Sequence, residues 1–389
     1  MTKDDSNTMP AARPNWMTDE LGALQMASRQ FYQREYIPND DRWSKQQHVD
    51  REAWTKAGSA GLLCASIPKA YGGGGGNFAH EVVINQEQYR AVSCGVANEV
   101  HSGIVAQYFL KFGAEPQKQR WLPKMATGEY ISAMAMSEPG AGSDLRSMRT
   151  TARREGDHYL INGAKIFISN GHLADLICLA AKTDPDGGSR SISLIVVETK
   201  DLQGFRRGRI LDKIGNKAQD TSELFFDDVR VPVANLLGTE GDGLQLMMRE
   251  LPQERLLIAV QAIATMERAI ELTLEFLQDR QQCGARLTAM RDARLKLAEC
   301  RTETQVARIF VDDCIEQHLA GELDTVTASM AKSWCTQKQC EVVDACLQLH
   351  GDHGYMREYP IARMYADVRV KKIVGGANEI MKEIIARSL

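Results

Sequence analysis

The sequence predicts a mainly helical α+β protein, with a helical N-terminal domain, a small β-barrel or β-sandwich domain in the middle and a C-terminal four-helix bundle. Apolar residues recur at helical spacing up to about residue 125 and again after residue 243, whereas short apolar runs separated by turns lie between these regions. The 389 residues, 43% of them hydrophobic, are enough for two or three domains. We expect a disordered tail and three domains, at residues 1–17, 18–129, 130–237 and 238–389.

The first predicted helices follow the tail. The stretch DELGALQMASRQFYQREYI, residues 19–37, carries apolar residues at three- and four-residue steps, and Pro38 follows its apparent end. The stretch DREAWTKAGSAGLL, residues 50–63, repeats this pattern. Both stretches indicate amphipathic helices that bury one face, as a helical domain requires.

From about Tyr130 to Leu236 the pattern indicates strands. The run RTTARREGDHYLINGAKIFISNG, residues 149–171, predicts two or three strands with turns at EGD and NG. The runs ADLICLAAKT, SISLIVVE and SELFFDDVRVP follow, and no helical pattern of useful length lies between them. This arrangement is typical of a small barrel or sandwich.

The helical period returns in the last third of the chain. Apolar stripes run through LLIAVQAIATMERAIELTLEFL, DARLKLAECRTETQVARIFVDDCI and TASMAKSWCTQKQCEVVDACLQL, and a shorter helical pattern ends the chain. Three long amphipathic helices and a shorter one predict a helix bundle.

The composition excludes several classes of protein. With 47 basic and 51 acidic residues, the chain has no strong charge that would attract nucleic acid, and no apolar run approaches membrane-spanning length. The nine cysteines are scattered without a C-x-x-C pair, which suits free thiols in a reducing compartment. The N-terminus is polar and acidic, unlike a secretory or transit signal. We expect a soluble cytoplasmic protein.

The segment MAMSEPGAGSDLRS, residues 134–147, is the densest candidate for a binding site. Pro139, Gly140 and Gly142 force an irregular loop after a strand. Such a loop can hold a polar ring or a phosphate, or it can be a plain surface turn. About thirty residues later KIFISNG, residues 165–171, ends an apolar strand on short polar groups. The short polar side chains of interest in the two segments are Ser137, Ser143, Asp144, Ser169 and Asn170.

Five motifs together carry a resemblance to a known family. The motifs MAMSEPGAGSD, NGAKIFISNG, TSELFFDDVRVP, LPQERL and HGDHGYMREYPIARMYADVRV occur in the order and spacing of the acyl-CoA dehydrogenases. The similarity extends from about residue 20 to the C-terminus. Within the family, LPQERLLIA and GGANEIMKEIIAR most resemble the long-chain acyl-CoA dehydrogenases and next the isovaleryl type.

The resemblance implies FAD-dependent oxidation of an acyl-CoA thioester to the trans-2-enoyl-CoA. In this family a carboxylate removes a proton from Cα, a hydride passes from Cβ to flavin N5, and the electrons go to electron-transfer flavoprotein. The resemblance further implies a homotetramer that takes part in fatty acid β-oxidation in a bacterial cytoplasm. The expected substrate carries a medium-chain, long-chain or branched acyl group. Two alternatives stay open: an acyl-CoA oxidase that uses oxygen, and a catalytically silent acyl-CoA-binding homologue.

The resemblance also locates the catalytic base. Gly375 stands where many family members carry the catalytic glutamate, but in the long-chain and isovaleryl branches the base lies within LPQERL, here Glu254. Pro252 should kink the helix and aim Glu254 away from the solvated face. An apolar pocket would then raise the pKa of Glu254 towards neutral pH. The alternative is that Glu254 and Arg255 are ordinary exposed helix charges.

The remaining site residues follow from the same resemblance. It assigns the cofactor to Met134, Met136, Ser137, Gly142, Ser143, Phe167, Ile168, Ser169, Arg280, Gln282, Arg291, Gln348, Gly351, Asp352, Ala377 and Glu379. It assigns the substrate to Ser143, Gln245, Pro252, Gln253, Arg255, Gly375 and Gly376. The residues Arg280 and 348–352 would reach the cofactor of a neighbouring subunit. We expect no metal, because His350, Asp352 and His353 of HGDH have no second ligand cluster near them.

The sequence departs from the family pattern at three instructive places. Asp352 replaces a glycine, Ala377 replaces a threonine that contacts the cofactor, and Arg291 replaces a glutamine. Because a carboxylate repels phosphate, these changes predict weaker binding of FAD rather than a loss of the chemistry. Glu99, in NEVHSGIV, is a polar residue beside the expected acyl pocket. We expect it to face solvent, with contact to a hydroxylated or branched acyl tail as the alternative.

Overall fold

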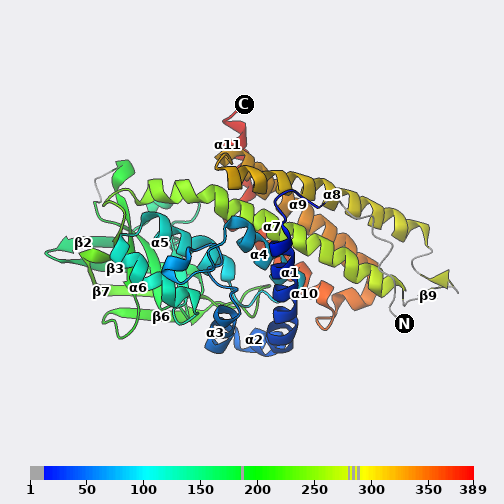
Figure 1. Ribbon diagram of the computed structural model, residues 1–389, viewed down its shortest axis with the longest axis horizontal. Helices are drawn as coiled ribbons and strands as arrows, with labels where there is room; N and C mark the ends of the chain where they lie inside the picture. The colour runs from blue at the N-terminus through cyan, green and yellow to red at the C-terminus, as the bar shows by residue number, and fades with distance from the viewer. Residues whose placement is uncertain (1–12, 185–187, 279–280, 283–284, 287–289) are drawn as a thin grey trace.

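The computed structural model describes residues 13–184, 188–278, 281–282, 285–286 and 290–389, and it contains a helical part, a β part and a helix bundle (Figure 1). Thr18 caps the first helix, because its side chain accepts a hydrogen bond from the Leu21 N–H at 3.3 Å. The helices of the first part are α1 (Asp19–Phe31), α2 (Asp40–Gln46), α3 (Arg51–Ser59), α4 (Phe78–Arg90), α5 (Ala106–Phe112) and α6 (Glu115–Ala126), with the π-helical turns η1 (Tyr32–Tyr36) and η4 (Glu99–Val105).

The chain before α1 is attached to the bundle. Trp16 is buried, and its indole N–H donates to the carboxylate of Asp312 at 3.1 Å. We expected a loosely attached tail through residue 17. The structure differs at Trp16, because its indole ring packs in an apolar site and its N–H bonds an acceptor on a distant helix. Residues 1–12 of that predicted tail lie outside the described residues.

The middle part is an eight-stranded sheet. Along the sheet the order is β6-β7-β3-β2-β4-β5-β8, and β1 pairs in parallel with β4. Along β4, Leu176 and Cys178 face the N-terminal helices, while Ile177 and Leu179 face the core of the sheet, so the strand is buried on both sides. The strands are β1 (Ser132–Ala135), β2 (Thr151–Glu155), β3 (His158–Ser169), β4 (Leu176–Lys182), β5 (Ile192–Glu198), β6 (Phe205–Ile210), β7 (Thr221–Pro232) and β8 (Leu236–Leu237).

One predicted turn lies inside a strand. The chain turns between β2 and β3 at Gly156, as EGD predicts, but Asn162 and Gly163 continue β3. The register with β7 shifts at this point, and a Cβ on Gly163 would overlap the side chain of Thr150. Glycine is therefore needed for a bulge and a close approach rather than for a hairpin turn.

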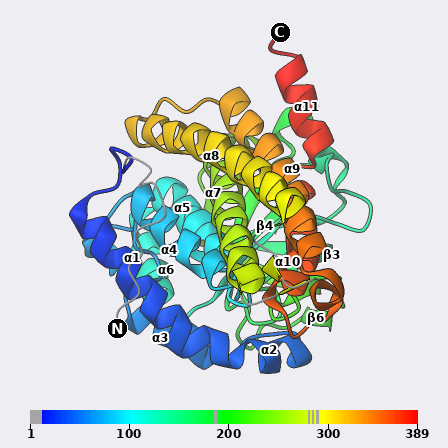
Figure 2. The same ribbon diagram turned by 90° about the vertical axis from the view of Figure 1, so that its right-hand side faces the viewer.

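The last third of the chain forms the predicted helix bundle (Figure 2). The buried apolar side chains of its helices belong mainly to one hydrophobic core. Its long helices pack on one another, and α4 of the first part also contributes side chains to this core. None of the described helices is long and apolar enough to cross a membrane. The helices are α7 (Gly243–Gln278), α8 (Arg291–Ala320), α9 (Thr325–Leu349), α10 (Pro360–Val368) and α11 (Asn378–Ala386); the short strands β9 (Gln281–Gln282) and β10 (Ala285–Arg286) connect α7 to α8.

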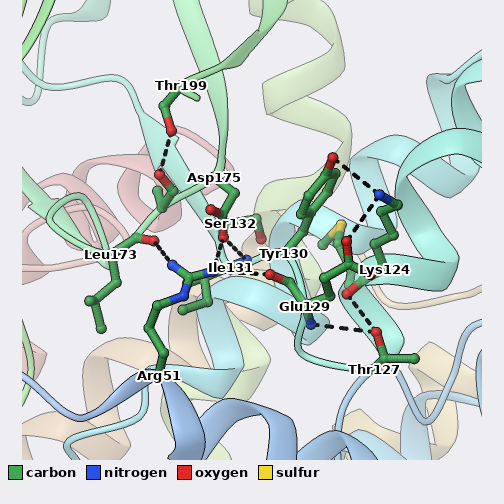
Figure 3. Close-up of polar contacts among 12 residues, drawn as sticks. Arg51, Lys124, Thr127, Glu129, Tyr130, Ile131, Ser132, Leu173, Asp175 and Thr199 are labelled. Atoms are coloured by element: carbon green, nitrogen blue, oxygen red, sulfur yellow. Dashed lines mark hydrogen bonds and ion pairs between the residues drawn. The ribbon is translucent and has the colours of Figure 1, made fainter. Parts of the chain in front are cut away.

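An arginine joins the first helices to the sheet (Figure 3). The Arg51 guanidinium donates to the carbonyl oxygens of Leu173 at 2.9 Å and Glu129 at 3.0 Å, and to the carboxylate of Asp175 at 2.6 Å. Asp175 also accepts from the Ile131 N–H at 2.9 Å. These bonds hold the start of β1, and hence the loop that follows it, in a fixed position against the helical part.

Candidate active site

A buried carboxylate lies in α7. Glu254 is only 6% exposed, and the Tyr108 hydroxyl donates to its Oε1 at 3.0 Å. Burial, with a smaller contribution from the nearby Glu250, raises the pKa of Glu254 to about 7 against the opposing effect of the Tyr108 hydrogen bond. Arg255 is buried as well. The alternative of ordinary exposed helix charges is therefore wrong for both residues.

The helix α7 runs without interruption through Pro252. Around Glu254 it is fixed by side chains that reach other segments. Gln253 donates to the Gly103 carbonyl in η4 at 2.7 Å, and Lys111 of α5 pairs with Glu250 at 2.6 Å. These contacts place η4 and α5 against the face of α7 that carries Glu254.

The C-terminal glycine turn lies against the same face of α7. Gly375 has a φ of +65°, and a Cβ at this position would overlap Cδ1 of Ile258. Ile258 follows Glu254 by four residues, so the two side chains are neighbours on one face of the helix. Gly375 is thus next to the face that carries the candidate base.

Substitution of Gly375 by alanine should cost both stability and activity. The left-handed backbone alone costs a non-glycine residue about 1 kcal/mol, and the new methyl group displaces Ile258 beside Glu254. Gly321→Ala is the matched control, because Gly321 has a φ of +76° but open space around a Cβ. Chemical denaturation and turnover assays should show a larger loss for Gly375→Ala. Equal losses in both variants would show that crowding at Gly375 has no role.

A buried lysine holds the glycine turn from the other side. The Lys332 ammonium donates to the Gly376 carbonyl at 2.7 Å and to Oδ1 of Asn378 at 2.8 Å. Burial and the nearby Arg255 lower the pKa of Lys332 to about 7. Arg255 donates to the Ser329 hydroxyl at 3.1 Å. The sequence reasoning did not find Lys332; the only signal was a lysine within the apolar stripe of α9.

The loop after β1 is bound to the end of β3. The Lys165 ammonium donates to the Met136 carbonyl and to Oε1 of Glu138, both at 2.9 Å, and the Ile166 N–H donates to the Ser137 carbonyl at 3.0 Å. Glu138 also accepts from two backbone N–H groups at 2.6 and 3.0 Å. The two segments that the sequence singled out are therefore brought together.

The end of β3 carries an unusual backbone. Phe167 has a φ of +63° and is 65% exposed, and Asn170 has a φ of +62°. The register with β7 shifts between Lys165 and Ile168. A bulky residue in this conformation is a sign of a functional constraint. Asn170 is held by hydrogen bonds from its side-chain amide to the Ala97 and Ser132 carbonyls.

These segments fit a flat ring with polar edges. Phe167 exposes its aromatic ring, whereas the next residue, Ile168, is buried. In the part of the chain that the structure describes, the hydroxyl groups of Ser137, Ser143 and Ser169 make no hydrogen bond. Gly142 has open space around it. An isoalloxazine ring, with its apolar faces and hydrogen-bonding edges, is a group of this kind.

The other predicted cofactor residues lie elsewhere in the chain. Ala377 and Glu379 adjoin the start of α11, which packs on α9 near Lys332. Gln348 lies in the last turn of α9, about 24 Å from Lys332 along this helix at 1.5 Å per residue. The other residues at that far end are Gly351 and Asp352 in η9 (Gly351–Tyr355), and Arg291 at the start of α8. This second set therefore lies far along α9 from Lys332 and the glycine turn.

Four further positions from the sequence analysis need comment. Arg280 lies outside the described residues, and of Gln282 only the backbone is described, in β9. Gln245 is exposed in the first turn of α7, about 13 Å from Glu254 along the helix. Glu99, expected to face solvent, is only 12% exposed because its Oε1 accepts a hydrogen bond from the buried Tyr89. The solvent expectation for Glu99 is wrong.

Comparison with known proteins places this fold in one family. Three family models match in order: the N-terminal, middle and C-terminal domains of acyl-CoA dehydrogenases, over residues 18–129, 133–229 and 241–389. The pig (Sus scrofa) mitochondrial long-chain specific acyl-CoA dehydrogenase is 45% identical over 93% of this chain and 84% of its own. The isovaleryl-CoA dehydrogenase of Pongo abelii is 32% identical over 96% of this chain and 89% of its own.

A solved structure agrees with these relatives. The acyl-CoA dehydrogenase from Geobacillus kaustophilus superposes with a TM-score of 0.94 at 45% identity, covering 97% of this chain and 99% of that one. The fold and the site define a flavin-dependent oxidoreductase whose cofactor is FAD. The chain belongs to the acyl-CoA dehydrogenase family, and the resemblance noted in the sequence is confirmed.

Proposed function

We propose that the protein oxidises a medium-chain, long-chain or branched acyl-CoA to the trans-2-enoyl-CoA, with Glu254 as the catalytic base. The observation that carries this proposal is the burial of Glu254, with a pKa near 7, on the face of α7 that meets Gly375. A carboxylate with such a pKa is ionised in part at neutral pH and is basic enough to remove a proton next to a thioester. The named activities of the relatives support the same reaction.

The chain's own residues have separate tasks in this reaction. The Glu254 carboxylate takes the proton from Cα, while the Tyr108 hydroxyl holds Oε1 in place. Gly375 leaves space for the thioester because it has no side chain, and Lys332 fixes the turn through the Gly376 carbonyl. Bound FAD supplies the acceptor for the hydride that leaves Cβ. No water is needed in any of these steps, which suits a buried base.

The residues proposed for the cofactor fall into two groups. The loop from Met134 to Ser143 and the strand end at Phe167, Ile168 and Ser169 would hold the ring within one subunit, with Ala377 and Glu379 beside it. The second group, at the far end of α9, would bind the phosphates of a neighbouring subunit's FAD. The separation of about 24 Å along α9 between Lys332, beside the glycine turn, and Gln348 favours a site that is shared between subunits. From the family resemblance we propose a homotetramer. We further propose electron-transfer flavoprotein as the electron acceptor and the cytoplasm as the location.

The pH dependence of kcat/KM tests the role of Glu254. Because the ionised form is the base, kcat/KM should rise with pH through an apparent pKa of about 7. The Tyr108 hydrogen bond stabilises the ionised form, so Tyr108→Phe should raise the pKa of Glu254 and lower kcat/KM several-fold at pH 6. At pH 9 the kcat/KM values of the wild type and of Tyr108→Phe should become similar, because Glu254 is ionised in both. A kcat/KM that does not change with pH, or the same apparent pKa in Tyr108→Phe as in the wild type, would argue against Glu254 as the base.

Product analysis tests the reaction itself. Incubation with saturated acyl-CoA thioesters and an artificial electron acceptor should give products lighter by two hydrogen atoms in mass spectrometry. Oxygen consumption without that acceptor would identify an oxidase instead. Purified protein that contains no flavin and takes up no added FAD would point to a silent homologue.

A further inference from the structure

A buried polar cluster lies farther along α7 from the candidate base. Lys371 donates to the Tyr89 hydroxyl at 2.6 Å and to Oε1 of Gln261 at 2.7 Å. The Tyr89 hydroxyl in turn donates to Oε1 of Glu99 at 3.1 Å, and the Lys371 ammonium lies 3.9 Å from the same oxygen. We call these four residues the Glu99 cluster. Their side chains come from α4, η4, α7 and the segment after α10.

The cluster has a hydrogen-bond acceptor that no described group uses. Oε2 of Glu99 is buried and has no donor within the described chain. A buried carboxylate oxygen without a donor is costly, so a ligand that donates to it gains more than an ordinary hydrogen bond. A cavity of 20 Å³, lined in part by Tyr89, Lys371 and Thr265, adjoins the cluster and has room for about one water-sized group.

The walls that flank Glu254 lead to this cluster. Gln261 follows Glu254 by seven residues on the same face of α7, about 10 Å along the helix, with Ile258 between them. The turn η4 contacts Gln253, the neighbour of Glu254, through the Gly103 carbonyl, and it begins at Glu99. On the other side, Lys371 precedes Gly375 by four residues. The same three segments therefore border both the base and the cluster.

We infer that the acyl chain extends from Glu254 along α7 to the Glu99 cluster, and that the preferred substrate carries a hydroxyl group there. This inference rests on the proposed function and adds the substrate class to it. An extended alkyl chain advances about 1.3 Å per bond, so about 10 Å corresponds to eight bonds beyond Cα. A hydroxyl on the tenth carbon of the acyl chain meets the cluster.

The polar groups of the Glu99 cluster should bind a hydroxylated acyl chain more tightly than a plain alkyl chain. A terminal methyl group would face a charged lysine and carboxylate and leave Glu99 Oε2 without a donor. A hydroxyl group donates to that oxygen and supplies the hydrogen bond that the described chain leaves unmade. Hydrogen bonds to charged groups change affinity by about tenfold or more, which sets the expected preference.

Binding of CoA thioethers tests the inference without any turnover. We would titrate the FAD-loaded enzyme with S-decyl-CoA and its ω-hydroxy derivative in a calorimeter. The wild type should bind the hydroxylated thioether at least about tenfold more tightly. Glu99→Leu combined with Lys371→Met replaces the buried ion pair by apolar groups, and this double variant should prefer the plain chain. Arg153→Met with Glu155→Leu removes an exposed ion pair on β2 and should keep the wild-type preference.

The possible outcomes separate this inference from the proposed reaction. Equal or tighter binding of the plain thioether by the wild type would overturn the inference, as would a double variant that keeps the hydroxyl preference. Failure of both thioethers to bind would overturn it too. If the hydroxylated thioether binds as expected but no thioester reduces the flavin, the assignment of the pocket stands and the proposed oxidation fails.

Discussion

Glu254→Gln should lower the rate of enoyl-CoA formation by about a thousandfold or more, while FAD content stays near that of the wild type. Glutamine has the size of glutamate and can still accept the Tyr108 hydrogen bond, but it cannot take a proton from Cα. Turnover with the best thioester of a panel, measured beside flavin absorbance, checks this expectation. An activity loss below tenfold would show that another group is the base.

Glu254→Gln should also differ from the wild type in how its free energy of unfolding depends on pH. The folded protein holds the pKa of Glu254 near 7, above the ordinary value of 4.5. Its ionisation therefore lowers the free energy of unfolding as pH rises from about 4.5 to 7, and the glutamine variant lacks this fall. Glu267→Gln is a suitable control on the same helix, because Glu267 pairs with Arg90 and Arg308 near the surface. It should keep full activity.

Lys165→Met should destabilise the protein by about 3 kcal/mol and weaken its hold on FAD, because it leaves the buried Glu138 carboxylate without its ammonium partner. Lys165 is fully buried and also donates to the Met136 carbonyl, so its loss frees the loop that follows β1. Chemical denaturation and the flavin-to-protein ratio after gel filtration measure the two effects.

A matched lysine separates this effect from a general loss of charge. Lys182 lies in β4 of the same sheet and is partly exposed. Lys182→Met should change the free energy of unfolding by less than about 1 kcal/mol and leave FAD bound. Equal stability and flavin content in Lys165→Met and Lys182→Met would contradict the role of Lys165 in holding the loop after β1.

The sequence predicted the helices and most strands because their apolar residues follow a single local period. In α8, for example, the buried side chains repeat at three- and four-residue steps from Ala293 to Cys314. The strand β4 was readable because its residues are buried on both faces. The candidate base was located by resemblance to a family motif, and the structure adds its burial and its contact with Tyr108.

The polar residues inside the protein were harder to predict. Glu99 and Lys332 look like surface residues in the sequence, but their partners come from segments far away in the chain. Tyr89 and Lys371 are separated by 282 residues, and no local pattern indicates that their side chains meet. The positive φ of Phe167 could not be predicted from the sequence either, because it accompanies a register shift between β3 and β7 and does not follow from the residue type.

An anaerobic titration of the wild-type enzyme with acyl-CoA thioesters, followed by flavin absorbance beside Glu254→Gln, tests the central claim most directly. We predict that at least one thioester bleaches the flavin of the wild type and that the variant, with the same flavin content, keeps its oxidised spectrum. Bleaching of both proteins at similar rates would contradict the assignment of Glu254. A flavin that no thioester of the panel reduces, in either protein, would contradict the proposed oxidation itself.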